Sequence, residues 1–329
     1  MSQKKKTAII YGLGRAYREQ EEWINEQFEV TGYSDKKSFA VDGYISPDEL
    51  KWKEADYVYI TSREYYDEIK AELIKAGVDA GKITSRADLI GEVRNAELRD
   101  AWVIKKLREI PAGKVLLDAG AGEMPYAPYC SHLHYISQDF GKYAPNDMQE
   151  GFRTGVDRWD TSRVSITCDI TRMPLEDGSV DVVLCTEVFE HLPEPLLALQ
   201  EFSRILKKGG TLLLTAPFCS LTHMAPYYYA NGFSKYWYEE SLKKFGFQID
   251  EMEQRGSFYQ WLAQEIHRLP EIAQRYSHYD MSREDRETLT DSLKLLHQLD
   301  QMDAGGVRVK YCALDICWLR IGNRRGGIC

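Results

Sequence analysis

The sequence predicts an α/β protein with two doubly wound domains, and two segments carry that prediction. Thr7–Gly14 (TAIIYGLG) and Lys114–Gly122 (KVLLDAGAG) each hold a short apolar strand that runs directly into a glycine turn. A strand followed by a glycine turn and a helix is how a Rossmann-like domain begins. The chain has 329 residues, which is enough for two domains. We therefore expect a small domain over residues 1–90 and a larger one over residues 91–329.

The composition excludes several classes of protein. Hydrophobic residues make up 43% and charged residues 28% of the chain, as in a folded globular protein rather than a disordered or fibrous one. The formal net charge of −9 argues against a nucleic-acid partner, because binding to phosphates needs a basic face. No apolar run approaches the roughly 20 residues of a membrane span, and the N-terminal apolar stretch is too short for a signal peptide. The seven cysteines include no CxxC pair, which is typical of a reduced, cytoplasmic protein.

The first domain is expected to alternate strands and helices after its glycine turn. Ala16–Gln27 and Tyr65–Ala76 read as helices, and Gly77 ends the second of them. Phe28–Tyr33 (FEVTGY) and Tyr57–Thr61 (YVYIT) read as strands, because they are short and rich in aromatic and β-branched residues.

The second domain repeats the same order over a longer segment. Glu92–Ile110 reads as a connecting helix, and Leu196–Leu206 reads as an amphipathic helix closed by Gly209-Gly210. A charged helical insertion over residues 260–304 precedes the last strand. Its leucine side could face the sheet or a second subunit, so a homo-oligomer is possible. The expected strands are Val115–Leu117, His134–Ser137, Val180–Cys185, Thr211–Ala216, Phe247–Met252 and Val307–Arg320.

Carboxylates follow three successive strands of the second domain. Asp118 ends the first strand, Asp139 follows the second, and Asp169 follows another short apolar stretch. Open α/β sheets bind ligands at the carboxyl ends of their strands. A carboxylate at Asp139 can accept two hydrogen bonds from a ribose diol, and one at Asp169 can accept from an adenine amine while Ile170 packs on the ring. Together these positions predict a nucleoside ligand.

The glycine turn of the second domain favours a ligand without phosphates. A dinucleotide site has the pattern G-x-G-x-x-G, in which the helix N-terminus binds the pyrophosphate. Here Gly120 and Gly122 are followed by Glu123 and Met124, and the third glycine is missing. A glutamate at this point would repel a pyrophosphate but is compatible with a cationic cofactor. S-adenosylmethionine (SAM), with its sulfonium, is such a cofactor.

Residues 92–258 resemble a class I SAM-dependent methyltransferase. The motifs that carry the resemblance are DAGAGEMPY, CDITRMPLEDGSVDVVLCTEVFEHL and EFSRILKKGGTLLLTAPF. A subgroup whose first motif reads G-x-G-x-x-P-Y is especially similar, and it often accompanies bacterial surface-polysaccharide or natural-product pathways. The resemblance implies a class I methyltransferase fold with SAM as cofactor. It also implies that Asp118, Gly120, Ala121 and Gly122 hold the methionine end, Asp139 the ribose, and Asp169 with Ile170 the adenine, while Thr186 and Glu187 line the cleft.

The segment after the fifth strand is expected to bind the methyl acceptor. Its aromatic residues Tyr227, Tyr228, Tyr229 and Trp237 suit a sugar or a flat ring, although packing within a lid or an interface is an equal alternative. His223 lies at the expected mouth of the cleft and is one candidate catalytic base. His191 is the other, although a structural role in holding its loop is favoured.

No metal site is expected from the sequence. His132 and His134, with Cys130 nearby, alternate on one extended stretch, and no second ligand pair stands at helical spacing. A polar strand edge explains them better.

The first domain carries half of a dinucleotide fingerprint. Gly12 and Gly14 are present and Asp35 lies near the ribose-acid position, but Tyr17 replaces the third glycine. The segment resembles small Rossmann-like domains attached to some sugar-modifying enzymes. The first domain could bind no ligand, a sugar nucleotide or another nucleotide, and NAD is disfavoured.

The favoured function is therefore methyl transfer from SAM to a small molecule, with a sugar or sugar nucleotide as the first acceptor. One rival is an NAD-dependent sugar oxidoreductase that uses the first domain. The other is a non-catalytic binding or scaffold protein, against which the three intact acids argue.

Overall fold

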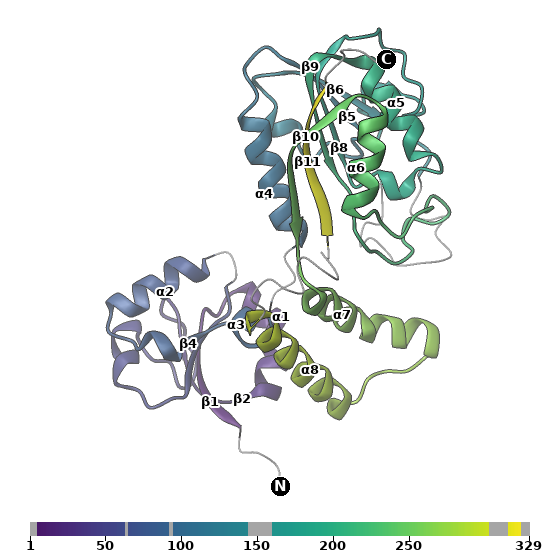
Figure 1. The fold of residues 1–329 in the computed structure, drawn as a ribbon. Coiled ribbons are helices and arrows are strands. Elements are labelled where there is room, and N and C mark those ends of the chain that lie inside the picture. The colour runs from purple at the N-terminus through teal and green to yellow at the C-terminus, as the bar shows by residue number, and fades with distance from the viewer. Residues whose placement is uncertain (1–4, 63–64, 92–94, 144–159, 303–314, 324–329) are drawn as a thin grey trace. The chain divides into compact units, whose positions relative to one another are not determined.

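The computed structural model describes residues 5–62, 65–91, 95–143, 160–302 and 315–323 (Figure 1). The chain divides into two compact units. Unit 1 comprises residues 1–93 and 262–304, and unit 2 comprises residues 94–261 and 305–329. No helix among the described residues is both long and apolar enough to cross a membrane.

Unit 1 is built on a four-stranded parallel sheet in the order β2-β1-β3-β4. Alternate residues of β1 face opposite sides, so that Ile9 and Tyr11 pack in one apolar cluster and Ala8 and Ile10 in another. The strands are β1 (Lys6–Tyr11), β2 (Phe28–Ser34), β3 (Tyr57–Ile60) and β4 (Ile83–Thr84). The helices are α1 (Arg15–Gln27), α2 (Tyr66–Lys75), α3 (Arg86–Ile90) and the short 3-10 turns η1 (Pro47–Trp52) and η2 (Ala80–Lys82).

The glycine turn of unit 1 is tied to the acid that follows β2. Gly12 has φ +95°, a conformation that favours glycine, and its N–H donates to the Ser34 carbonyl at 2.9 Å. The Leu13 N–H donates to Asp35 Oδ2 at 2.7 Å. Tyr17 packs edge-to-face on Tyr33 with ring centroids 6.1 Å apart. Asp35, which lies near the position of the ribose-binding acid in dinucleotide sites, therefore uses its carboxylate to stabilise the turn.

Unit 2 contains a seven-stranded sheet in the order β10-β11-β9-β8-β5-β6-β7. The strands from β9 to β7 are parallel, whereas β11 runs antiparallel to both β9 and β10. The strands are β5 (Val115–Ala119), β6 (His134–Asp139), β7 (Ile166–Thr167), β8 (Val180–Thr186), β9 (Leu206–Thr215), β10 (Phe247–Arg255) and β11 (Asp315–Asn323). The helices are α4 (Asn95–Arg108), α5 (Pro195–Ile205), α6 (Lys235–Lys244) and the 3-10 turns η3 (Ala127–Tyr129) and η5 (Phe189–His191).

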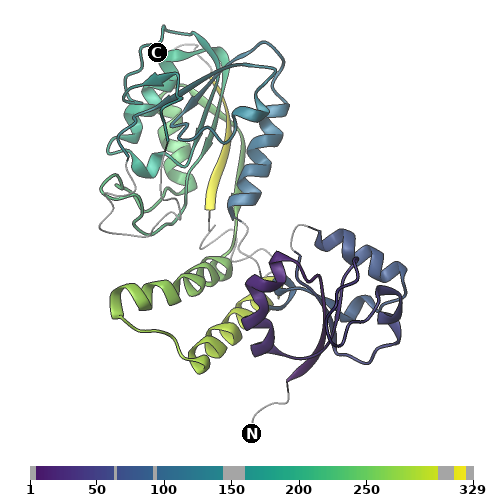
Figure 2. The ribbon, with the colours of Figure 1, turned by 180° about the vertical axis from the view of Figure 1, so that it is seen from behind.

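Helices cover both faces of this sheet, with α4 on one side and α5 and α6 on the other, as both views show (Figures 1 and 2). Side chains alternate along β5 accordingly: Leu116 packs with Val103 and Leu107 of α4, and Leu117 packs in the cluster that contains Phe202 and Leu242. This is the doubly wound arrangement that the sequence predicted, and in such sheets ligands bind at the carboxyl ends of the strands, here those of β5, β6 and β8.

The helical insertion before the last strand is present as α7 (Phe258–Ser277) and α8 (Arg283–Met302). Residues 262–304 group with unit 1, however, and not with the second domain to which the sequence analysis assigned them. Lys294 Nζ donates to Gln27 Oε1 at 3.0 Å, and His297 lies against Gly91. The apolar side of α8 is therefore covered within unit 1, where Leu293 and Leu296 are buried. Of the expected strand Val307–Arg320, residues 307–314 lie outside the described residues, and β11 begins at Asp315.

Candidate functional site

The turn after β5 has a backbone that only glycine adopts readily. Gly120 and Gly122 have φ of +76° and +52°. The N–H groups of Gly120 and Ala121 both donate to the Gln138 carbonyl at 2.8 Å. A Cβ on Gly120 would lie 2.4 Å from Val188 Cγ2. Glycine is thus required because the turn packs closely on the loop after β8. This contact brings together two of the segments that were predicted to bind the cofactor.

Asp139 fastens this turn to the end of β6. Its carboxylate is buried, Oδ2 accepts from the Gly122 N–H at 3.0 Å, and Oδ1 accepts from the Gly141 N–H at 2.9 Å. A carboxylate oxygen can accept two hydrogen bonds, so each oxygen keeps one lone pair. Asp139 therefore organises the turn and can still accept from a ligand.

Asp118 is a buried carboxyl group beneath the turn. It is 1% exposed, and the Tyr135 hydroxyl donates to its Oδ2 at 2.6 Å. Burial raises the pKa of Asp118 to about 7; the Tyr135 hydrogen bond opposes the shift and the charge of Asp139 adds to it. A ligand cation near Asp118 would favour the ionised carboxylate, as the predicted contact with the methionine ammonium requires.

Asp169 and Ile170 follow β7 but face different surroundings. Asp169 is exposed, and its Oδ1 accepts from the Thr171 N–H at 2.8 Å and from the Thr171 hydroxyl at 2.7 Å. Ile170 is only 5% exposed and packs in the core with Met173. Asp169 is therefore the accessible side chain of the pair, whereas Ile170 packs at the edge of the core next to it.

Thr186 is the last residue of β8 and Glu187 directly follows the strand, where its carboxylate is held on two sides. Its Oε1 accepts from the Thr215 hydroxyl at 2.9 Å, and its Oε2 lies 3.5 Å from Arg99 Nη1. Glu187 has φ +53°, which is uncommon for a residue with a side chain. Such a strained position is typical of functional loops. Arg99 is a residue that the sequence analysis missed, since it lies within α4 and no strand end marks it.

The structure brings the two predicted histidines together. The His191 and His223 rings have centroids 4.9 Å apart, and His191 Nδ1 lies 2.6 Å from the Tyr227 carbonyl oxygen. Burial lowers the pKa of His191 to about 4, with a further contribution from His223. Near neutral pH the His191 ring is therefore neutral, and it holds the Tyr227 segment in place. Glu190, which the sequence analysis also missed, is 1% exposed and adjoins both rings.

The predicted aromatic residues divide into two groups. Tyr227 packs on Phe140 with centroids 5.0 Å apart, and Tyr228 packs beside His223 at 5.0 Å. Tyr229 is 53% exposed. Trp237 instead contacts Phe233, Phe189 and Tyr238, as a core residue does. The three tyrosines therefore lie near the candidate site, and Trp237 contributes to the core.

Two family models match parts of this chain. Residues 117–214 match the family described as methyltransferase domain, and residues 4–84 match the family described as C2185-like, N-terminal. The first match covers the glycine turn, Asp118, Asp139 and Asp169. These features and the sheet define the class of protein: unit 2 is a class I SAM-dependent methyltransferase domain, and SAM is its cofactor.

Particular relatives show how far the likeness extends. The chain is 27% identical over 206 residues to ubiquinone/menaquinone biosynthesis C-methyltransferase UbiE of Burkholderia mallei, covering 57% of this chain and 75% of that protein. It is 43% identical over 49 residues to an uncharacterized 37.1 kDa protein in transposon TN4556 of Streptomyces fradiae, or 15% of this chain and 14% of that protein. Among solved structures, a putative sarcosine dimethylglycine methyltransferase from Galdieria sulphuraria is similar with a TM-score of 0.41 and 17% identity, covering 71% of this chain and 88% of that one.

Proposed function

We propose that the protein transfers a methyl group from SAM to a hydroxyl group of a small molecule, with a sugar or sugar nucleotide of a surface-polysaccharide or natural-product pathway as the acceptor class. The observation that carries this proposal is the set of acids at the ends of neighbouring strands, Asp118, Asp139 and Asp169. The net charge of −9 supports a small molecule rather than a nucleic acid as the partner.

The cofactor contacts follow from the hydrogen-bonding capacity of these acids. Asp139 keeps one lone pair on each oxygen for a ribose diol, and the exposed Asp169 can accept from the adenine amine. The residues fit SAM better than a dinucleotide, because Glu123 would repel a pyrophosphate. When bound, SAM supplies an electrophilic methyl group next to a sulfonium. Gly120 and Gly122 give the turn at the methionine end the positive φ angles that it requires.

The acceptor side is proposed to lie at the ends of β8 and β9. His223 and Tyr228 have rings 5.0 Å apart, and Tyr229 is exposed. Aromatic side chains with a few polar groups suit a hydroxylated ring. His223 is half-buried and is proposed to act on the acceptor hydroxyl, whereas the more deeply buried His191 positions the loop through Tyr227. Holding the acceptor in line and excluding water supplies the rest of the rate enhancement.

A cytoplasmic location is part of the same proposal. Cys130, Cys168 and Cys185 carry free thiols, as is usual in a reducing compartment. Both SAM and sugar nucleotides would have to be supplied in the compartment where the protein acts.

Release of S-adenosylhomocysteine in the presence of SAM and candidate acceptors tests this function. A panel of sugar nucleotides is compared with a panel of phenolic rings, because the quinone-pathway name of one relative makes a ring the other acceptor to examine. We expect release with a sugar nucleotide. His223→Ala should lower turnover by about 10²- to 10⁴-fold while cofactor affinity is kept, and His134→Ala, an exposed histidine of β6, is the control. Release with phenolic rings alone would contradict the acceptor class, and full activity of His223→Ala would contradict the assigned residue.

A further inference from the structure

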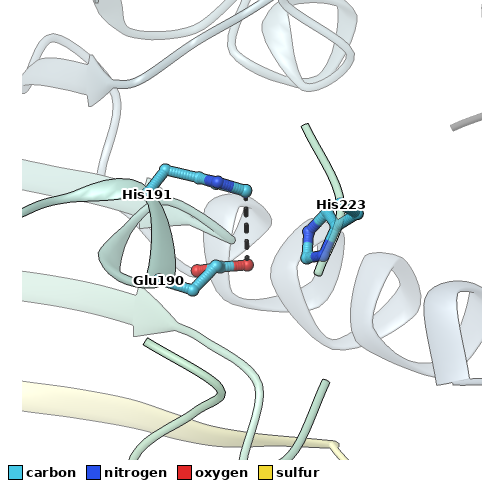
Figure 3. A group of neighbouring side chains, drawn as sticks. All are labelled: Glu190, His191 and His223. Atoms are coloured by element: carbon cyan, nitrogen blue, oxygen red, sulfur yellow. Dashed lines mark ion pairs between the residues drawn. The ribbon is translucent and has the colours of Figure 1, made fainter. Parts of the chain in front are cut away.

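Three side chains with metal-binding atoms converge beyond the ends of β8 and β9 (Figure 3). Glu190 and His191 belong to η5, and His223 comes from the segment after β9. One oxygen or nitrogen atom from each residue lies within 4.8 Å of the others. In Figure 3 the Glu190 carboxylate faces the His191 ring, and the His223 ring stands beside the space between them.

Backbone hydrogen bonds determine which ring nitrogens can bind a ligand. His191 Nδ1 lies 2.6 Å from the Tyr227 carbonyl oxygen, and His223 Nδ1 lies 2.9 Å from the Leu221 carbonyl oxygen. A carbonyl oxygen can only accept, so Nδ1 carries the hydrogen in both rings. In a neutral imidazole the other nitrogen, Nε2, then holds the lone pair. Metal-bound histidines are oriented by hydrogen bonds of this kind.

The distance between His191 and Glu190 fits a shared cation. His191 Nε2 lies 3.7 Å from Glu190 Oε1, too far for a direct hydrogen bond. Two ligand atoms that each lie about 2.0–2.2 Å from a tetrahedral zinc ion are about 3.4 Å apart. The Glu190 and His191 side chains are 2% and 13% exposed, so a positive ion between them would offset the cost of burying the carboxylate.

We propose that Glu190, His191 and His223 bind one divalent transition-metal ion. Two imidazoles and one carboxylate suit zinc and its first-row neighbours, and three protein ligands leave a coordination position open. The sequence predicted no metal site. It could not indicate this cluster, because Glu190 and His191 are adjacent in the chain but His223 is brought to them only by the fold.

The open position gives the metal a task at the acceptor. A bound ion lowers the pKa of a coordinated oxygen, so an acceptor hydroxyl on the metal would lose its proton to solvent water more readily. The acceptor oxygen would then bond to the methyl group of SAM while the bond from that methyl group to sulfur breaks, and S-adenosylhomocysteine would leave. His223 then acts on the acceptor through the ion, and not as a free base. This second step rests on the proposed function, whereas metal binding itself does not.

Calorimetric titration of the full-length protein with Zn²⁺ alone, after treatment with a chelator, tests the site. We expect one ion per chain. Changes to residues that only orient ligands cost about 10- to 100-fold in affinity, so His223→Ala and Glu190→Gln should each cost at least about 100-fold. His134→Ala should bind as the unchanged protein does. Thermal unfolding of each variant identifies any loss that is due to misfolding, and visible absorption of the Co²⁺-loaded protein reports the ligands independently.

Three results would overturn the proposal: no Zn²⁺ binding by the unchanged protein, equal binding by the folded His223→Ala variant, or Co²⁺ spectra that do not change in Glu190→Gln. Titration of the same samples with S-adenosylhomocysteine separates this proposal from the previous one. Metal binding without cofactor binding would refute the proposed function alone, and cofactor binding without metal binding would refute this inference alone.

Discussion

Replacing Asp118 by Asn should make the protein more stable than the unchanged protein at pH 8. At pH 5 this gain in stability should be much smaller. The folded-state pKa of Asp118 is raised from 3.8 to about 7, chiefly by burial. The folded protein therefore keeps this proton at pH values where the unfolded chain has lost it. The contribution of Asp118 to the free energy of unfolding is greatest below pH 3.8 and falls as the pH rises through about 7.

The magnitude follows from the pKa difference. The interval from 3.8 to about 7 corresponds to about 4 kcal/mol, of which about 3 kcal/mol is lost between pH 5 and pH 8. For a domain of this size, that loss is a change of roughly 6–12 °C in Tm. Asn has nearly the same shape as Asp and can accept the Tyr135 hydrogen bond, but it carries no charge at either pH.

Thermal unfolding of both proteins at pH 5 and pH 8, without cofactor, measures the effect. We expect the Tm difference, variant minus unchanged protein, to rise by several degrees between the two pH values. Other groups titrate in both proteins and cancel in this difference. An equal Tm difference at the two pH values would refute the reasoning, because it would mean that Asp118 is ionised in the folded protein throughout.

Three further predictions concern other positions. Asp181→Asn should have the opposite pH dependence. Although burial opposes ionisation, hydrogen bonds from Lys207, the Val115 N–H and Lys114 lower the pKa of Asp181 to about 2, so up to about 2 kcal/mol of stability that is present above pH 4 is lost as the pH falls toward 2. A difference in Tm between the variant and the unchanged protein that stays constant from pH 7 to pH 3 would contradict this. Gly232→Ala should lower stability by more than about 1 kcal/mol in denaturant unfolding, because its Cβ would lie 2.1 Å from the Phe218 carbonyl oxygen; a variant of unchanged stability would show that this loop relaxes freely. Millimolar NAD should not raise the Tm of the full chain, and a rise that Gly12→Val abolishes would favour the oxidoreductase alternative.

The sequence predicted the two sheets because most of their strands carry a local signal, although the two-residue strands β4 and β7 were not among the expected ones. Val115–Leu117 and Val180–Cys185 lie within observed strands, since apolar runs that end in turns are legible without tertiary information. Strand ends were less accurate: Leu206 begins β9 directly after α5, five residues before the expected start at Thr211. The pattern of apolar residues continues across that junction, so it does not mark where the helix stops.

Features that depend on distant contacts could not be predicted. Residues 262–304 belong to unit 1 because of contacts such as the hydrogen bond from Lys294 to Gln27, two residues that are far apart in the chain. Arg99 reaches Glu187 from a helix whose sequence gives no hint of that contact. An apolar side chain such as Ile170 suits a ligand ring and a core equally well, so only the fold could show that it packs with Met173. Periodicity identifies elements and strand-end residues, whereas pairings between elements need the fold.

Calorimetric titration of the full chain with S-adenosylhomocysteine tests the central claim most directly. Asp139 and Asp35 form a matched pair: Asp139 is the last residue of β6, Asp35 directly follows β2, and each carboxylate accepts a hydrogen bond from the N–H of a neighbouring glycine turn. The unchanged protein should bind one molecule per chain. Asp139→Ala should weaken binding by roughly 30- to 150-fold, or about 2–3 kcal/mol, and Asp35→Ala should leave it unchanged. No binding by the unchanged protein, or equal affinity in a folded Asp139→Ala variant, would contradict a SAM site at the ends of β5 and β6.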